Sequence, residues 1–273
     1  MDQEKVVLIT GASSGIGYQT AEKLVKQGYR VFGAARRVER MAGLTQLGVT
    51  PVYLDITDED SIAEMVQSVI DQAGRIDVLV NNAGYGSYGV IENVKISEAK
   101  NQFEVNIFGL ARLVQLVLPH MRAQHAGKII NISSMAGRIT TYMGAWYHAT
   151  KYALEAFSDA LRMEVAPFGI DVVIIEPGGI KTNWGLIAAD HLRDSSKGTV
   201  YEQMADQAAD KMQKTYTSNR LSDPMVIANA ITRATNSPHP HPRYLVGYGA
   251  KVSVFMHTVL PTRVFDKLIK AMV

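Results

Sequence analysis

The 273-residue sequence contains no cysteine and no apolar run long enough to cross a membrane. The absence of cysteine excludes disulfides, thiolate metal sites and a cysteine nucleophile. The longest apolar stretch, residues 110–121, is interrupted by Arg112, Gln115 and Pro119, whereas a membrane helix needs about 20 apolar residues. The first residues do not form a secretory apolar segment either. We therefore expect a soluble, cytoplasmic protein without a membrane span.

The sequence also lacks a strong charge of one sign. Its 28 Lys and Arg residues nearly balance 26 Asp and Glu residues, and no long basic block occurs. This gives no reason to expect a nucleic-acid partner, because such proteins usually carry a concentrated basic patch. His239 and His241 lie in a proline-rich loop without a nearby third ligand, so no metal site is expected.

What the sequence does have is a regular alternation of short apolar strands and longer helical segments. Strands are expected at 6–9, 30–35, 51–56, 76–80, 128–132, 171–175 and 244–246, and helices at 16–27, 58–72, 97–124, 147–167, 224–235 and 262–272. The strands are continuously apolar rather than alternating, which indicates that both faces of the sheet are covered. This order predicts one α/β domain over residues 1–273, a doubly wound parallel sheet of about seven strands with helices on both faces.

Two segments depart from the alternation. Residues 183–222 are polar at their centre and lack the apolar periodicity of a fixed element, so we expect a mobile lid over the substrate site. Residues 251–273 end in an amphipathic segment and carry four Lys or Arg residues against one Asp, a net charge of +3. We expect this tail to pack over the substrate pocket or against a partner subunit, with binding to a membrane surface as an alternative.

A glycine-rich turn joins the first expected strand to the first helix. Gly11 permits a tight turn, Gly15 lets the backbone approach a pyrophosphate, and Gly17 allows close helix packing. The spacing G-x-x-x-G-x-G differs from the commoner G-x-G-x-x-G. The turn predicts a dinucleotide site, and an ordinary glycine-rich turn is the alternative.

The end of the second expected strand bears on the choice of dinucleotide. A site for NAD usually places an acid here to bind the ribose hydroxyls, but this sequence has Ala35 followed by Arg36 and Arg37. Two guanidinium groups are suited to a 2′-phosphate. The pattern predicts a preference for NADP(H), unless the arginines are only solvated charges.

Tyr147 and Lys151 are spaced i and i+4, which places them on one face of the expected helix. A nearby ammonium stabilises a phenolate and so lowers the pKa of a tyrosine toward the range useful for proton transfer. The pair alone is a weak signal, because the same spacing recurs by chance on solvated helices.

Taken in order along the chain, these pieces resemble the short-chain dehydrogenase/reductase superfamily of the single-domain type. The matching segments are 10–17, 55–56, 81–84, Asn106, 132–137, Tyr147-x-x-x-Lys151 and 177–182. The resemblance implies a Rossmann-type fold and an oxidoreductase. Residues 81–89 and 243–247 look more like the hydroxysteroid and retinol dehydrogenase branch than like the reductases of fatty-acid synthesis.

The resemblance also implies roles for individual residues. Tyr147 would be the proton donor or acceptor, and Lys151 would hold the nicotinamide ribose and lower the pKa of the tyrosine. Ser134 would polarise the substrate carbonyl, and Asn106 would position a water that links Lys151 to solvent. The full set of expected cofactor-binding residues is Gly11, Ser13, Ser14, Gly15, Ile16, Gly17, Arg36, Arg37, Asp55, Ile56, Asn82, Ala83, Gly84, Tyr147, Lys151, Pro177, Gly178, Ile180 and Thr182.

The expected function is therefore NADP(H)-dependent interconversion of a carbonyl and an alcohol. The expected pocket is rich in apolar and aromatic residues, which favours an apolar substrate: Tyr85, Tyr88, Met135, Ile139, Tyr142, Met143, Trp146 and Trp184. A redox sensor of the same fold without catalysis is the alternative, although such a protein would be expected to lack Tyr147 or Lys151. The expected helices at 97–124 and 147–167 carry more apolar surface than the sheet needs, which predicts a homodimer or homotetramer.

Overall fold

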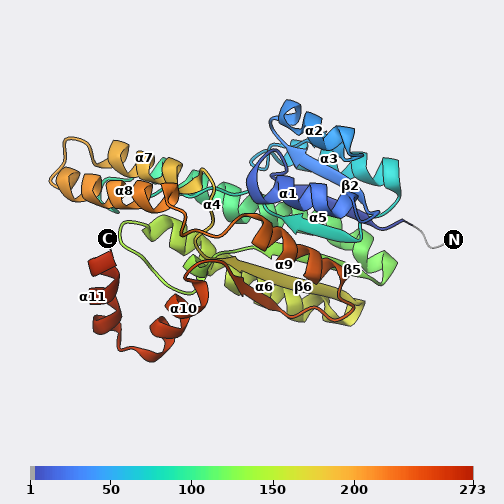
Figure 1. Ribbon diagram of the computed structural model, residues 1–273. Helices are drawn as coiled ribbons and strands as arrows, with labels where there is room; N and C mark the ends of the chain where they lie inside the picture. Colours follow the sequence, from blue (N-terminus) through green and yellow to red (C-terminus); the bar gives the residue numbers. More distant parts are fainter. Residues whose placement is uncertain (1–3, 273) are drawn as a thin grey trace.

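The computed structural model describes residues 4–272 and contains a seven-stranded sheet in which every neighbouring pair of strands is parallel. The strand order is β3-β2-β1-β4-β5-β6-β7. The strands are β1 (Val6–Thr10), β2 (Arg30–Ala35), β3 (Thr50–Tyr53), β4 (Val78–Asn81), β5 (Gly127–Ile132), β6 (Ile170–Pro177) and β7 (Arg243–Val246). Helices lie on both faces of this sheet (Figure 1). The predicted doubly wound α/β fold is confirmed.

The helices form two layers with separate apolar cores. The helices are α1 (Gly15–Val25), α2 (Ala42–Gln46), α3 (Glu59–Ala73), α4 (Ile96–Phe103), α5 (Gly109–Gln124), α6 (Ala145–Val165), α7 (Trp184–Ser196), α8 (Glu202–Thr217), α9 (Met225–Asn236), α10 (Ala250–Val259) and α11 (Thr262–Met272), with short turns η1 (Val38–Met41), η2 (Glu104–Phe108), η3 (Met135–Gly137) and η4 (Ala166–Phe168). In β1, Val6 and Leu8 face the core under α3, α5 and α6, whereas Val7 and Ile9 face the core under α1 and α9. Both faces are buried, which explains why the strands are continuously apolar.

The order of the strands determines where a binding crevice forms. The chain runs outward from β1 to β3 and then returns to β4 on the other side of β1, so a crevice opens at the carboxyl ends of β1 and β4. The loops that follow β1, β4, β5 and β6 all begin at this edge, because the strands are parallel.

The expected helix at 97–124 is interrupted. Helix α4 passes into a π-helical turn, η2, before α5 begins at Gly109. Asn106 lies inside this turn and is buried. A π-helical turn inserts an extra residue into the hydrogen-bond register, and such turns frequently mark functional sites.

Residues 183–222 contain two packed helices, α7 and α8, and this corrects the expectation of a segment without apolar periodicity. Their contact is made mostly of small side chains, namely Ala188, Ala189, Leu192, Ala205, Ala208 and Ala209. Alanine is a weak apolar signal in sequence, yet it lets two helices approach closely. A hydrogen bond between Ser87 and His191, one from Asn93 to Thr199 and one from Tyr201 to Glu92 join this α7–α8 hairpin to the loop between β4 and α4. The mobility of the segment stays a prediction.

The base of the hairpin is closed by backbone pairing. An isolated bridge joins Ile180 to Ser222, so the chain entering the hairpin and the chain leaving it run side by side. Lys181 donates its backbone N–H to Ser222, and Ser222 donates to Gly179, at 2.9 and 3.1 Å.

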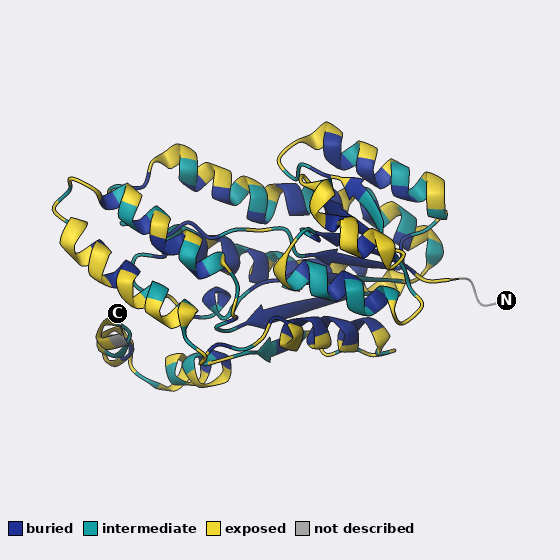
Figure 2. Cartoon of the chain, turned by 45° about the horizontal axis from the view of Figure 1, so that its top comes forward, coloured by how far each residue is buried: buried dark blue, intermediate teal, exposed yellow. Residues whose placement is uncertain are grey.

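After β7 the chain forms a separate two-helix arm, α10 and α11, at the opposite end of the molecule from the N-terminus (Figure 1). Much of its surface is exposed, as the yellow colouring shows (Figure 2). Among residues 4–272, no helix is long and apolar enough to cross a membrane.

Candidate active site

A cavity of about 920 Å³ opens at the predicted crevice. One end is lined by the turn after β1 and by the end of β2, and the other by aromatic and aliphatic side chains that include Tyr88, Trp184 and Tyr216. The side chains of Ser134, Tyr147 and Lys151 line the same cavity. The cavity therefore has a polar part, an apolar part and a junction of three polar side chains, Ser134, Tyr147 and Lys151.

The glycine turn fits a pyrophosphate. Gly11 has φ +67°, and a Cβ there would approach the Asn82 side-chain amide to 2.9 Å. A Cβ on Gly17 would lie 2.5 Å from the Gly11 carbonyl oxygen, so α1 can pack this closely only on glycine. Gly15 has φ +56°, and its Cβ would meet only an ordinary contact of 3.9 Å with Thr182. Backbone N–H groups at the start of α1 are thus open to an anion.

The turn is held in place by the first residues after β4. The Asn82 amide donates hydrogen bonds to the carbonyl oxygens of Thr10 and Gly11 at 3.0 and 3.2 Å. The Thr10 hydroxyl accepts from the backbone N–H groups of Asn82 and Ala83, both at 3.0 Å. Asn82 therefore fixes the shape of the phosphate turn from the neighbouring strand.

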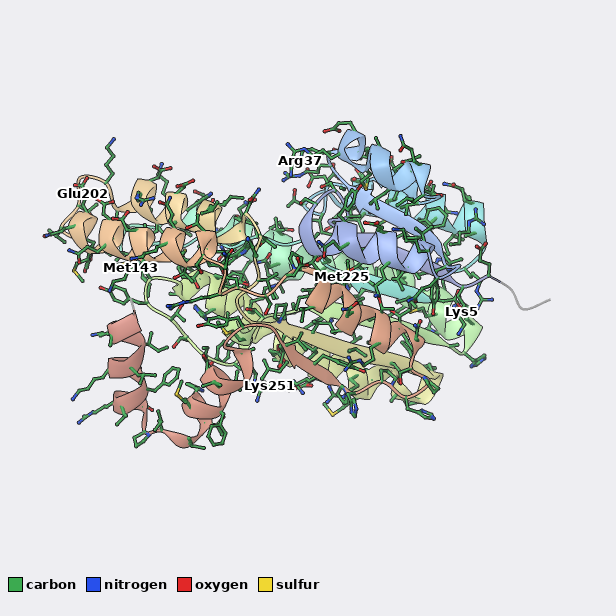
Figure 3. The ribbon with its side chains drawn as sticks, viewed as in Figure 1. Lys5, Arg37, Met143, Glu202, Met225 and Lys251 are labelled. Carbon is green, nitrogen blue, oxygen red and sulfur yellow. The ribbon has the colours of Figure 1, made fainter. Side chains whose placement is uncertain are left out.

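The end of β2 presents two arginines to the cavity. Arg36 and Arg37 are exposed and line its polar end, beside Asp55. Figure 3 labels Arg37 on the loop that follows β2. Burial acts to raise the pKa of Asp55, but hydrogen bonds from Thr57 and the charge of Arg36 lower it overall. This end therefore carries cationic groups next to an ionised carboxylate.

Tyr147 and Lys151 come from the first turns of α6, and Ser134 follows β5. Burial raises the pKa of Tyr147, while a hydrogen bond with Ser134 acts in the opposite direction. The Lys151 ammonium donates to the Ile132 carbonyl at 2.9 Å and lies 5.9 Å from the centre of the Tyr147 ring. Burial lowers the pKa of Lys151 to about 8, against the opposing effect of Glu155. The three side chains line one cavity, and their catalytic roles stay a prediction.

Asn106 forms hydrogen bonds that join the loop after β4 to α6, next to this junction. Its side-chain oxygen accepts from the Tyr85 N–H at 3.1 Å, and its amide donates to the Tyr85 carbonyl and the Thr150 hydroxyl at 2.9 and 3.1 Å. A Cβ on Gly84 would lie 3.0 Å from Asn106 Oδ1 and 4.0 Å from Lys151 Nζ, so Gly84 packs between them. Asn106 is not among the residues that line the cavity.

The apolar part of the cavity is an aromatic wall built partly by the hairpin. Ring centroids are separated by 4.9 Å for Tyr147 and Trp184, 5.8 Å for Tyr88 and Trp184, and 6.0 Å for Trp184 and Tyr216. Trp184 begins α7, and Tyr216 lies in the last turn of α8. Both ends of the hairpin therefore reach the neighbourhood of Tyr147.

Nearly all of the predicted cofactor residues line this cavity. The exception is Gly17, which acts through packing. Of the expected pocket residues, Tyr142, Met143 and Trp146 do not line the cavity, although Met143 packs against the aromatic wall. Sequence reasoning missed Tyr216, Ile187 and His191, which reach the cavity only because α7 and α8 fold back over it.

These features define a dinucleotide-binding protein with a Tyr-Lys-Ser junction at the end of a parallel sheet. The family model described as short chain dehydrogenase matches residues 5–188. The chain belongs to this family of short-chain dehydrogenases and reductases.

Several known proteins are similar to this chain over nearly its whole length. A probable short-chain type dehydrogenase/reductase VdlC from Helicobacter pylori is 35% identical over 98% of this chain and 97% of its own. An NADPH-dependent 3-dehydrocapnine reductase from Ornithobacterium rhinotracheale is 33% identical over 97% of this chain and 95% of its own. The crystal structure of a short-chain dehydrogenase from Streptomyces avermitilis has a TM-score of 0.82 and 34% identity, covering 99% of this chain and 96% of that one.

Proposed function

We propose that this protein is an NADP(H)-dependent oxidoreductase that interconverts a carbonyl and a primary or secondary alcohol on a mainly apolar small molecule. The observation that carries this proposal is the junction of Tyr147, Ser134 and Lys151 inside one cavity, between a phosphate-binding turn and an aromatic wall. Family membership supports the oxidoreductase class. The cytoplasmic location and the homo-oligomer expected from the sequence stay predictions.

NADP(H) is the proposed cofactor. The turn from Gly11 to Gly17 would hold the pyrophosphate, and Arg36 and Arg37 would bind the 2′-phosphate with their guanidinium groups. Ile180 and Thr182 would contact the nicotinamide end from the base of the hairpin. The name of the NADPH-dependent relative supports this choice.

The protein's own part is to position the substrate and to move a proton. When bound, the cofactor supplies or accepts a hydride at the substrate carbon. In reduction, Tyr147 donates its phenolic proton to the carbonyl oxygen, and in oxidation it removes the hydroxyl proton. Ser134 donates a hydrogen bond to the same oxygen and stabilises the negative charge that develops there.

Lys151 makes this proton transfer possible near neutral pH. A lowering of the tyrosine pKa by 3 units corresponds to about 4 kcal/mol of preferential stabilisation of the phenolate. Burial acts against this lowering and a hydrogen bond with Ser134 acts toward it, and we propose that the Lys151 ammonium, 5.9 Å from the ring centre, supplies the rest. Asn106 is the proposed anchor of a water path from Lys151 to solvent.

The substrate is proposed to be apolar because Tyr88, Trp184 and Tyr216 form much of the surface beyond Tyr147. Such a wall buries rings and alkyl chains favourably and offers little to a sugar. A member of the hydroxysteroid and retinol dehydrogenase branch would fit, and this finer assignment stays a prediction.

The test is a substrate screen. Ketones and aldehydes of graded size and polarity are mixed with protein and NADPH, alcohols with NADP, and the change in nicotinamide absorbance is followed, with NADH and NAD in parallel. Turnover of apolar carbonyl compounds supports the proposal. Tight NADPH binding without turnover of any class would favour the redox-sensor alternative.

A further inference from the structure

The C-terminal arm, residues 250–272, presents an apolar stripe to the outside. Val252, Phe255 and Val259 lie at spacings of three and four on α10, which places them on one helix face, and they are 62%, 65% and 55% exposed. Val264, at the start of α11, is 48% exposed. These side chains belong to an ordered helix pair and yet face away from the protein.

The same arm has a separate anchoring face, so the exposed stripe is not needed to attach it. Phe265 is 2% exposed and Val254 is 9% exposed, and both belong to one apolar cluster with Ile139. The His257 ring contacts the edge of Phe265 at a centroid distance of 4.9 Å. Ile139 also lines the cavity, so the arm lies directly behind the apolar wall of the candidate active site.

The arm also concentrates the positive charge of the protein. Arg263, Lys267 and Lys270 recur at spacings of four and three on α11 and are exposed, so they form a basic ridge. With Lys251 and Asp266, residues 251–273 carry a net charge of +3, whereas the whole chain carries +2. The remaining 1–250 therefore has a net charge of −1.

We propose that this arm docks on a lipid surface that contains anionic headgroups. An arm that carries an exposed apolar stripe on one helix and a basic ridge on the next has the two features that bind an anionic membrane surface, because apolar burial and attraction to anionic lipid act together. A second copy of the arm would bring +3 against +3, and the rest of the chain has a net charge of only −1, which disfavours self-association through the arm. The arm then brings the Ile139 wall of the cavity close to a phase in which apolar substrates dissolve.

Co-sedimentation of the full-length protein with vesicles tests this proposal without any activity measurement. Vesicles of phosphatidylcholine alone are compared with vesicles that contain roughly a third phosphatidylglycerol. The protein is expected to bind the anionic vesicles and to be released by high salt, which screens surface charge. Equal binding to both vesicle types, or no binding to either, overturns the proposal.

Matched variants test which residues of the protein contact the vesicles. Lys267→Gln with Lys270→Gln is expected to lower the partition coefficient roughly twenty-five-fold, since each basic residue contributes about fivefold. Lys211→Gln with Lys214→Gln, two exposed lysines at the same spacing on α8, is the control and should bind as the wild type does. Phe255→Ser with Val259→Ser should also abolish most binding, whereas Ile91→Ser, a substitution at a 64% exposed position elsewhere, should not.

Unchanged melting temperatures for these variants show that the exposed substitutions leave the fold intact. If the control variants lose binding as strongly as the arm variants, the proposal is wrong. If the Phe255 and Val259 substitutions instead dissociate an oligomer in light scattering while vesicle binding is unchanged, the stripe is a subunit interface and the lipid proposal is overturned.

Discussion

The rings of Trp184 and Tyr147 lie with their centroids 4.9 Å apart, which joins the first residue of α7 to the proposed proton donor. A Cβ on Gly86 would come within 2.2 Å of the Trp184 ring, so the loop after β4 also fits closely around this indole. The position of the hairpin and the shape of the pocket beside Tyr147 are therefore coupled through one side chain.

Trp184→Ala is expected to raise the KM for apolar substrates roughly tenfold, because it removes a large part of the aromatic wall. The affinity for NADPH should stay nearly unchanged, since the indole lies on the substrate side of Tyr147. Steady-state kinetics and NADPH titration measure the two effects. Trp146→Ala, at the other tryptophan, is the control because Trp146 does not line the cavity.

Tyr147→Phe removes the ionisable oxygen and keeps the ring. Turnover should fall by at least about a hundredfold while NADPH still binds, because only proton transfer is lost. Single-turnover kinetics and fluorescence titration measure these quantities. Tyr152→Phe, on the same helix at a 40% exposed position, should have wild-type activity. Retained turnover in the Tyr147 variant would show that another group is the acid.

The wild type should prefer NADPH over NADH by at least about tenfold in kcat/KM, or about 1.4 kcal/mol. Arg36→Asp is expected to reverse much of this preference, because an acid at this strand end repels the 2′-phosphate and accepts from free ribose hydroxyls. Arg40→Asp changes the same charge at an exposed position outside the cavity and serves as the control. Equal use of both cofactors by the wild type would contradict the assignment.

We expect Lys151 to change how the free energy of unfolding depends on pH. Its pKa is lowered to about 8 in the folded protein from an unfolded value near 10.5, so burial of the ammonium destabilises the fold below pH 8. Between pH 8 and 10.5 the unfolded chain binds more protons than the folded protein, and the free energy of unfolding rises with pH. The wild type should therefore gain about 2 to 3 kcal/mol over this window relative to Lys151→Met.

Urea unfolding of the cofactor-free proteins at pH 8 and 10.5 measures this difference. Groups common to both proteins cancel in the comparison. Lys197→Met, at an exposed lysine, should follow the wild type. A parallel pH dependence in wild type and Lys151→Met would mean that the lysine is not desolvated.

The predicted oligomer can be tested at the exposed apolar residues around α5 and α6. Phe108 is 56% exposed at the end of η2, and Met163 is 69% exposed on α6. Light scattering of the wild type should give a dimer or tetramer, and Phe108→Ser with Met163→Ser should shift it toward the monomer. A wild-type monomer at micromolar concentration would refute the prediction.

Much of this architecture could be predicted because local patterns determine it. The i, i+4 spacing of Tyr147 and Lys151 survives into the structure because both lie on one continuous helix, α6. The glycines of the phosphate turn were predictable because each meets a specific steric demand, as the close approaches at Gly11 and Gly17 show.

The parts that the sequence did not predict depend on contacts between distant segments. Tyr216 reaches the cavity only because α8 folds back along α7, and the alanines that allow this packing give almost no periodic signal. The π-helical turn at Asn106 is a change in backbone register, which residue type alone does not reveal. Likewise, the amphipathic pattern of α11 did not tell which of its faces would be covered by Ile139.

The bridge between Ile180 and Ser222 has a consequence for how this enzyme could be redesigned. It closes the base of the hairpin, so the forty or so residues above it form an interchangeable cassette with neighbouring ends. The phosphate turn, the arginines after β2 and the Tyr147 junction all lie outside that cassette. If Thr182 is kept, transplanting a differently shaped hairpin onto the same stem should therefore change the range of substrates and leave the proposed coenzyme-binding residues in place.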